Sequence, residues 1–482
     1  MSLLQEKALQ NDRWDDVEDV GDGFPSPTRS KTQKTLRWVA STTYRSISSM
    51  PFARNGRLRK TAWLDGLRGF AALLVYFLHH QVWAHSGLIM ENAYGYNGQY
   101  YMACLPIIRT FFTGGHYAVS VFFVISGYVL SAKPISLIHA RDFTKLSENL
   151  GSALFRRWTR LYIPVICSTL IIASMPHVFG VNANFVPERT WRDEMWKWYC
   201  EFKNFSFVFR LGGEPWFSYS FHLWSIPFEM RGSLCVYTAL LAFSRCSVTG
   251  RLCAEVGLAA YFLYIADGAH FAMFVMGMFL CDLDQLAEHG KLPGWMSRLG
   301  KFKQQLFYGM FVLGVVLGGC PSHHWDIQVL RDSPVWSWFT WLVPQAVFDY
   351  KWFFLFWAST FTVASVPRIS WLKQFFENRF CQYLGRISFA FYLVHGPVLW
   401  IMGERLYAAT GWVKEWQLTQ IPNWVNRCPL PSFGPLGLEF SFIVPHLVLL
   451  PLTCWLAEIA TVLFDEPSIK FSQWMYRKAT EE

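Results

Sequence analysis

The sequence predicts an all-α polytopic membrane protein, a bundle of about ten transmembrane helices. Of its 482 residues 52% are hydrophobic and only 16% are charged, too few polar side chains to cover a soluble domain of this size. Long apolar runs recur from residue 62 onward, and Lys and Arg gather in only some of the connections between them. Together these observations exclude an ordinary cytosolic enzyme.

Residues 1–60 predict a disordered, basic, cytosolic N-terminal tail. They are polar, and no apolar core precedes Trp63, which argues against a cleavable secretory signal peptide. Between Gly23 and Lys60 there are nine Lys or Arg residues and no Asp or Glu. Such a run beside a first apolar segment is typical of a topology signal, and we expect no nucleic-acid partner.

Ten apolar segments follow the tail, and a helix needs roughly 20 residues to cross a ~30 Å hydrocarbon core. Two of them, 252–266 and 269–282, are short and joined by an Asp-Gly turn, which predicts a hairpin that either crosses fully or re-enters. We assign 61–470 to one transmembrane domain and 471–482 to a short cytosolic C-terminal tail. The predicted spans are 62–83, 116–133, 161–179, 223–243, 252–266, 269–282, 305–320, 349–366, 387–403 and 440–464.

Placing the N-terminus in the cytosol collects the basic connections on one side of the membrane. Segments 139–160, 284–304 and 367–386 hold at least four Lys or Arg residues each, whereas 84–115 and 321–348 hold one each. With ten spans both termini are cytosolic. We expect a multi-pass protein of the endoplasmic reticulum or another endomembrane.

The eleven cysteines fall singly, without a C-x-x-C pair or a Cys/His cluster at zinc spacing. This pattern favours neither a disulfide scaffold nor a structural metal site. We therefore expect most of the cysteines to be buried thiols, and we expect no metal.

The first predicted span carries the densest set of ionisable side chains. Lipid makes such groups costly, so each needs a partner, a water-filled cavity or a chemical task. Arg68 and His79 are eleven residues apart, which places both on one helical face roughly 16 Å apart along the axis. Asp65 lies three residues before Arg68 and can pair with it. Two interpretations are open: a catalytic face toward the bundle interior, or an interfacial ion pair with His79 as a packing residue.

Glu229 lies at the start of the fourth predicted span, two residues after Pro227. Proline bends or unwinds a helix, and membranes tolerate the freed backbone groups where they line a cavity or are packed by protein. We expect Glu229 to face a wet interior, either in a catalytic role or in a salt bridge with an arginine of a neighbouring helix.

A basic cluster precedes the third predicted span. Arg157 and Arg160 are three residues apart, share one helical face, and stand beside Arg156 at the cytosolic surface. Forked guanidinium donors suit the binding of phosphate groups. Ordinary anchoring to anionic lipid heads explains the same residues, and on the residue pattern alone it is the favoured interpretation.

Two further motifs are explained by packing. Ser126-Gly127 in the second predicted span permits close helix approach. His395 in the ninth precedes Gly396-Pro397, whose freed carbonyl groups can satisfy its ring, and we assign it a mainly structural role.

Taken in chain order, these segments resemble the membrane-bound acyltransferase 3 family, in its fungal type. The similarity runs from about residue 62 to 470. The resemblance implies a domain of about ten transmembrane helices that moves an acyl group, often acetyl from acetyl-CoA, onto a hydroxyl. It implies acyl-CoA as a co-substrate and no permanently bound cofactor. The motifs are Leu64-Asp65-Gly66-Leu67-Arg68-Gly69 with His79, Phe122-Phe123-Val124-Ile125-Ser126-Gly127-Tyr128, Arg157-x-x-Arg160, Trp224-Ser225-x-x-x-Glu229 and Ser388-x-x-x-Tyr392-Leu393-x-His395.

Carried onto these motifs, the resemblance implies that His79 and Arg68 are the essential pair. A neutral imidazole is suited to take the proton from an attacking hydroxyl. Arg68 would bind donor phosphate or stabilise the oxyanion at the thioester carbonyl. Transfer through an acyl-histidine is the alternative. The resemblance also implies that Glu229 orients the base or holds Arg68, that Asp65 supports the same site, and that Arg157 and Arg160, with Arg156, meet the CoA phosphates.

The main hypothesis is a membrane O-acyltransferase whose acceptor is a hydroxyl-bearing small molecule, for example a secondary metabolite. The alternative is a polytopic transporter of a small organic or lipid substrate, in which Asp65, Arg68, Glu229 and His395 line a path. A transferase consumes acyl-CoA stoichiometrically, whereas a transporter needs a gradient and leaves the thioester intact. A non-catalytic membrane scaffold fits the buried ionisable groups least.

Overall fold

The computed structural model describes residues 58–181, 184–210, 215–294 and 299–481, and all regular secondary structure in these ranges is helical. The predicted all-α class is thereby confirmed. Of the predicted N-terminal tail only residues 58–60 belong to these ranges, and the rest lies outside the described residues.

Each of the ten predicted spans overlaps a long helix of the structure. The long helices are α3 (Ala62–Ala84), α6 (Gly115–His139), α7 (Phe143–Phe179), α9 (Ser225–Phe243), α10 (Val248–Tyr264), α11 (Ala269–Glu288), α13 (Lys303–Gly318), α15 (Tyr350–Ser365), α17 (Arg379–Val398), α21 (His446–Ala460) and α22 (Glu466–Thr480). Shorter helices in the connections are α4 (Gly87–Met90), α5 (Ile108–Phe112), α8 (Trp191–Phe205), α14 (Ile327–Arg331), α16 (Ser370–Phe376), α18 (Glu404–Thr410), α19 (Gln417–Gln420) and α20 (Phe440–Ile443).

Five stretches within the described ranges are long and apolar enough to cross a membrane. The count of about ten spans stays a prediction, because α13 and α15, with 16 residues each, are short for a crossing. The five are Gly115–His139, Phe143–Phe179, Ala269–Glu288, Arg379–Thr410 and Phe440–Thr480.

Helix α3 packs against both α6 and α17. Its contact with α17 is close because glycines meet there: a Cβ at Gly69 would lie 2.2 Å from the backbone nitrogen of Gly385. On the preceding turn of α3, a Cβ at Gly66 would lie 1.8 Å from the carbonyl oxygen of Phe376, the last residue of α16. Small residues at a crossing let two helix backbones approach inside a membrane. This contact sets the height of α3 in the bundle, and with it the positions of Arg68 and His79.

A second close crossing joins α6 and α11. A Cβ at Gly127 would lie 1.9 Å from the carbonyl oxygen of Phe274, and a Cβ at Gly277 would lie 2.0 Å from that of Val124. The predicted close approach at Ser126-Gly127 is therefore confirmed. The predicted hairpin also forms, since α10 packs against α11 and Asp267 between them adopts a positive φ of 47°.

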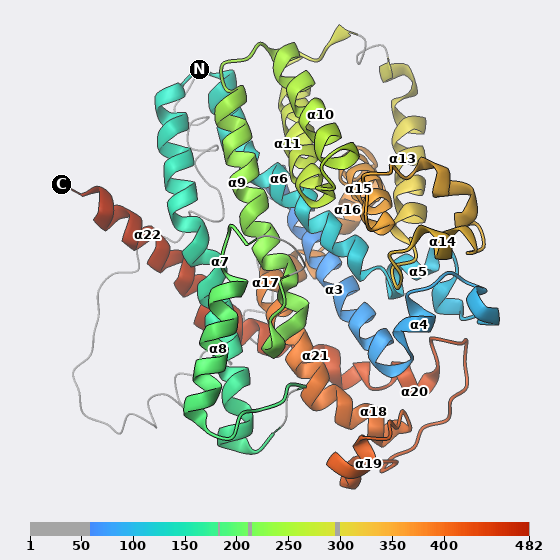
Figure 1. The fold of residues 1–482 in the computed structure, drawn as a ribbon. Helices are drawn as coiled ribbons and strands as arrows, with labels where there is room; N and C mark the ends of the chain where they lie inside the picture. Colours follow the sequence, from blue (N-terminus) through green and yellow to red (C-terminus); the bar gives the residue numbers. More distant parts are fainter. Residues whose placement is uncertain (1–57, 182–183, 211–214, 295–298, 482) are drawn as a thin grey trace.

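Helix α7 is 37 residues long, so the predicted cytosolic connection 139–160 is largely helical. The helix begins where the Asp142 carboxylate accepts a hydrogen bond from the backbone N–H of Lys145. Helix α22 packs against α7 and runs to Thr480, so most of the segment predicted as a C-terminal tail is helix (Figure 1). Helix α22 is polar on average, so it is stabilised by burying one face against the bundle. That residues 471–482 form a cytosolic tail stays a prediction.

Pro227 lies in the first turn of α9, so the predicted bend is wrong. An N–H at that position has no partner within the helix, and proline therefore costs nothing there. The residues before α9 form a tight 3₁₀ stretch, η4 (Ser218–Trp224), that brings His222 toward the bundle.

The extended connections lie at two opposite ends of the bundle. Figure 1 shows the start of α13 at the upper end, and α8, α18 and α19 at the lower end. Helix α3 runs between the two ends. We call the half of α3 that carries Arg68 the Arg68 end of the site, and the half that carries His79 the His79 end.

Candidate active site

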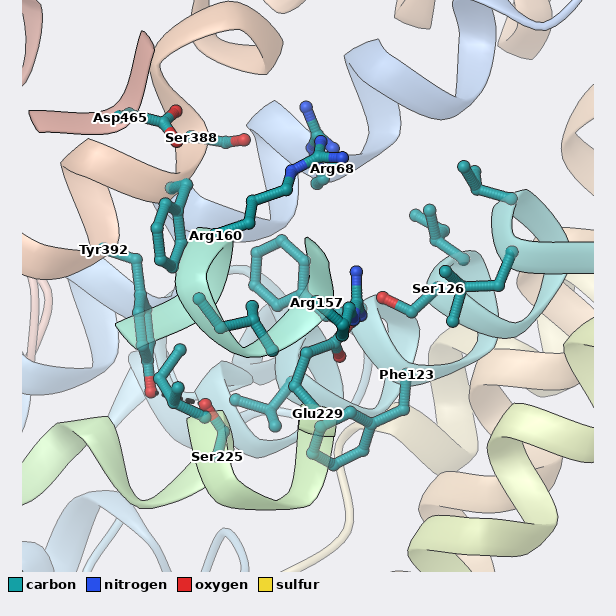
Figure 2. Close-up of a pocket in the computed structure, with 18 residues that line it drawn as sticks. Arg68, Phe123, Ser126, Arg157, Arg160, Ser225, Glu229, Ser388, Tyr392 and Asp465 are labelled. Atoms are coloured by element: carbon teal, nitrogen blue, oxygen red, sulfur yellow. Dashed lines mark hydrogen bonds and ion pairs between the residues drawn. The ribbon is translucent and has the colours of Figure 1, made fainter. Parts of the chain in front are cut away.

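A cavity in the described part of the chain gathers predicted site residues from different helices. Its volume is about 200 Å³. Arg68 of α3, Arg157 and Arg160 of α7 and Glu229 of α9 all line it, and Figure 2 shows these side chains around one space. We call it the arginine pocket. The other lining residues are Val119, Phe122, Phe123, Ile125, Ser126, Val129, Leu130, Leu161, Ser225, Ile226, Ser388, Phe389, Tyr392 and Asp465.

Glu229 holds Arg157 in place across the interface between α9 and α7. Nη2 of Arg157 lies 2.6 Å from Oε1 of Glu229, and its Nε donates to the Ser233 hydroxyl at 2.8 Å. Both side chains of the ion pair are mostly buried, with 12% and 16% exposed. The salt bridge to a neighbouring arginine, one of the two expected roles of Glu229, is therefore present. The carboxylate of Glu229 is thus directed to α7, and the implied role of Glu229 in orienting the base or holding Arg68 stays a prediction.

Arg68 is anchored to α17 and to its own helix. Its Nη2 donates to the carbonyl oxygen of Gly385 at 3.1 Å and lies 3.8 Å from the carboxylate of Asp65. The predicted pair of Asp65 and Arg68 is thus present. Asp65 also lies 3.6 Å from Arg59 and does not line the arginine pocket. It therefore stabilises the Arg68 end from outside the cavity.

Arg160 faces an acid that sequence reasoning missed. Asp465 ends a short π-helical turn (η10, Thr461–Asp465), is 8% exposed, lines the pocket and interacts electrostatically with both Arg160 and Arg68. Arg156 points elsewhere, since its Nε donates to the carbonyl oxygen of Ser152 at 3.2 Å and it does not line the cavity.

His79 lies at the other end of α3, outside the arginine pocket, and two further histidines lie beside it. Its ring centroid is 5.3 Å from that of His395 and 6.1 Å from that of His222, and these two rings are 4.5 Å apart. We call these residues the three-histidine group. The structure thus brings His395, predicted to be mainly structural, next to the predicted base. His222 was missed because no periodicity or spacing connects η4 to α3.

Tyr392 links the arginine pocket to the three-histidine group. Its hydroxyl lies in the pocket, 2.8 Å from Oγ of Ser225, and donates to the carbonyl oxygen of His222. In return, Nε2 of His222 donates to the carbonyl oxygen of Tyr392 at 3.0 Å. This reciprocal pair of bonds couples η4 to α17, so the two parts of the site have a defined relative position.

Helix α8 holds the η4 segment that carries His222. The buried carboxylate of Glu194 accepts hydrogen bonds from the Tyr219 hydroxyl and from the backbone N–H of Glu188, and it lies 3.1 Å from Nε2 of His177. Burial raises the pKa of Glu194, but these hydrogen bonds outweigh it and hold the pKa below its ordinary value. Glu194 is therefore ionised at neutral pH and holds the start of η4 through Tyr219.

A neighbouring polar group fills the space behind the three-histidine group. Nδ1 of His446 lies 2.9 Å from the Tyr76 hydroxyl and its Nε2 lies 3.4 Å from the Tyr407 hydroxyl. His80 contacts the same tyrosine, with its Nδ1 2.8 Å from the hydroxyl. Both nitrogens of His446 are thus satisfied by the protein, and we interpret it as a packing residue.

Fold and site together define a helix-bundle membrane protein with an internal cationic pocket. The family model described as an acyltransferase domain matches residues 61–445, and the chain belongs to this family. The predicted resemblance is confirmed, and the protein is an integral membrane acyltransferase.

Named relatives agree with this class. The chain is 30% identical to the O-acetyltransferase PaAT-1 of Phomopsis amygdali over 397 residues, which cover 74% of this chain and 76% of the relative. It is 22% identical to the acyltransferase clz18 of Cochliobolus lunatus, covering 87% of this chain and 96% of that protein. It is 23% identical to the acyltransferase R4 of a Phoma species, covering 72% and 84%. No solved structure gives a significant match. The predicted enzyme class, an O-acyltransferase, is confirmed.

Proposed function

We propose that the protein transfers an acetyl group from acetyl-CoA to a hydroxyl of a small-molecule acceptor. The observation that carries the proposal is the arginine pocket, where Arg68, Arg157 and Arg160 converge from two helices near one end of α3. Coenzyme A is a polyanion whose phosphates match forked guanidinium donors. The name of the relative PaAT-1, an O-acetyltransferase, supports acetyl as the group and oxygen as its destination.

In this proposal the donor binds with its phosphates at the Arg68 end and its thioester toward the His79 end. Arg157 and Arg160 contact the phosphates, and Arg156 lies outside the cavity as a peripheral contact. Arg68 and His79 are about 16 Å apart along α3, too far for both to touch the reacting carbonyl. Arg68 therefore binds phosphate rather than the oxyanion.

The chemical step requires one base beside the acceptor hydroxyl. The hydroxyl oxygen attacks the thioester carbon, and His79 takes the hydroxyl proton as the C–O bond forms. The C–S bond then breaks, and the leaving thiolate takes up the proton to give free CoA. Asp65 and Glu229 act through Arg68 and Arg157 and are positioning residues in this scheme.

The topology follows from the same assignment. We propose that the Arg68 end faces the cytosol, where acyl-CoA is made, with both termini on that side and about ten spans in an endomembrane. The acceptor is a hydroxyl-bearing small molecule, for which a secondary metabolite is our candidate.

The test is acetyl transfer by detergent-purified wild-type protein, with radiolabelled acetyl-CoA and a host-cell extract as the acceptor pool. We expect label in an extractable product, identified by mass, and release of one CoA thiol per product. Membranes from cells that lack the protein are the control. An intact thioester and no labelled product, together with gradient-driven solute uptake by reconstituted vesicles, would establish the transporter instead.

A further inference from the structure

In the three-histidine group, hydrogen bonds to backbone carbonyl oxygens determine which ring nitrogens of His222 and His395 carry a lone pair. Nδ1 of His395 lies 3.3 Å from the carbonyl oxygen of Phe391, and Nε2 of His222 lies 3.0 Å from that of Tyr392. A carbonyl oxygen only accepts, so each of these ring nitrogens carries the hydrogen. In the neutral rings the lone pairs are then on Nε2 of His395 and on Nδ1 of His222.

Both lone-pair nitrogens are buried and have no hydrogen-bond partner among the described residues. His395 is 1% exposed and His222 is 2% exposed. The absence of a side chain at Gly396 leaves room for the His222 ring, because a Cβ there would lie 2.6 Å from Nδ1 of His222. Buried polar atoms are normally satisfied, and two acceptors beside a predicted base match a ligand that brings hydrogen-bond donors.

Aromatic rings lead from the protein surface to the same place. Phe221 lies 6.1 Å from His79 between ring centroids, with Trp400 at 5.0 Å and Trp216 stacked on it at 5.7 Å and 13°. Trp216 is 60% exposed, and Trp400 is 2% exposed. Trp216 and Phe221 thus place two stacked rings between the exterior and the imidazole of His79, with the buried Trp400 packed against Phe221. Aromatic faces favour flat or ring-shaped partners.

We infer that the acceptor binds here, and that it is an alcohol on an apolar ring framework with a second hydroxyl beside the reacting one. The inference rests on the proposed function. The reacting hydroxyl lies at His79, and the neighbouring hydroxyl donates to Nε2 of His395, with His222 as the second acceptor. The ring body lies against Phe221 and Trp216. One hydroxyl donates only one hydrogen bond, so separate acceptors on His79 and His395 suit a diol better than a simple alcohol.

The test compares two probes, tetrahydronaphthalene with one hydroxyl and tetrahydronaphthalene with two adjacent hydroxyls, as acceptors of radiolabelled acetyl from acetyl-CoA. For wild type we expect kcat/KM to be about tenfold higher for the diol, because a site built for a hydroxyl rejects the analogue that lacks it. In His395→Phe this ratio falls to about one. His395→Gln keeps an acceptor at the distal position and retains part of the ratio. A ratio of two rates from one preparation does not depend on the folded fraction.

His446→Phe is the matched control, since it removes a buried histidine whose nitrogens both have protein partners, and the ratio stays at the wild-type value. For the ring framework, a straight-chain decane with two adjacent hydroxyls replaces the ring diol. Trp216→Ala lowers the preference for the ring diol, whereas Trp338→Ala, which also removes an exposed tryptophan, leaves it unchanged.

Equal kcat/KM values for the two probes in wild type, or an unchanged ratio in His395→Phe, would overturn the inference. Label in a host product that carries neither a ring nor a second hydroxyl would overturn it while leaving the transferase intact. An intact thioester with every acceptor would instead contradict the proposed function.

Discussion

The two ends of α3 differ in whether their buried polar groups are paired within the protein. At the Arg68 end, cations lie close to acids: Arg157 contacts Glu229 at 2.6 Å, and Asp465 faces Arg160 and Arg68. At the His79 end the described residues place three imidazoles within 6.1 Å of one another. Buried ring nitrogens of two of them have no protein partner.

This difference separates binding from proton transfer. A buried guanidinium is always charged, so it needs a carboxylate to offset the loss of hydration. An imidazole can stay neutral in an apolar place and keep a lone pair available for a proton. The Arg68 end is therefore suited to hold an anionic donor, and the His79 end to accept a proton from a neutral acceptor.

The largest expected effect is at the His79 end. His79→Ala removes the proposed base, so kcat for acetyl transfer falls about 10²- to 10⁴-fold with little change in KM for acetyl-CoA. The measurement is initial rate per folded protein, quantified by size-exclusion chromatography. His446→Ala, a matched loss of a buried imidazole, reduces thermal stability but leaves kcat within a few-fold. A His79→Ala enzyme with near wild-type kcat contradicts the assignment of the base.

The Arg68 end is expected to respond in KM rather than kcat. Arg157→Ala removes charge-assisted contacts worth about 1.5–3 kcal/mol, so KM for acetyl-CoA rises roughly 10- to 100-fold. Glu229→Gln leaves Arg157 charged but less well held and raises KM less. The double variant measures their coupling, expected at about 0.5–3 kcal/mol. A KM that both single variants leave unchanged would mean that the pair only stabilises the contact of α7 with α9.

A glycine substitution tests whether the three-histidine group depends on close packing. In Gly396→Ala the new Cβ would lie 2.5 Å from Cε1 of His222, so the ring must move, and unfolding free energy falls by about 1–3 kcal/mol. Gly257→Ala is the control, because nothing lies within 4 Å of its Cβ position, and alanine favours a helix by up to ~1 kcal/mol. Thermal melts of the two variants should shift in opposite directions. Equal shifts would mean that His222 has room to move.

The smallest expected effect comes from the anchor of η4. Glu194→Gln keeps the shape but loses ionised hydrogen bonds, which lowers stability by about 1 kcal/mol and kcat slightly. Because the folded pKa of Glu194 lies below its ordinary value, the stabilisation is present above the ordinary pKa and is lost as pH falls through the folded one. Melting temperatures of wild type and variant therefore converge in acid. A constant difference down to low pH would assign the effect to packing alone.

Much of the arrangement follows from local patterns. Apolar runs gave the positions of the long helices, and the spacing of Asp65 and Arg68 predicted their pair, since neighbours three residues apart share a helical face. The arginine cluster of α7 was also evident, although the pattern alone favoured lipid anchoring. For Glu229 the pattern predicts either a catalytic role or a salt bridge, without indicating which arginine would be the partner.

By itself, the sequence determined the helical class, the family and the side chains that carry charge into the bundle, because these depend on composition and on short-range periodicity. Only the tertiary structure decided that Glu229 meets Arg157, 72 residues away, that Asp465 joins the arginine pocket, and that His222 and His395 lie beside His79. The physical reason is that the depth and rotation of each helix are set by glycine crossings and side-chain packing between distant segments. Local sequence patterns do not specify these contacts between distant segments.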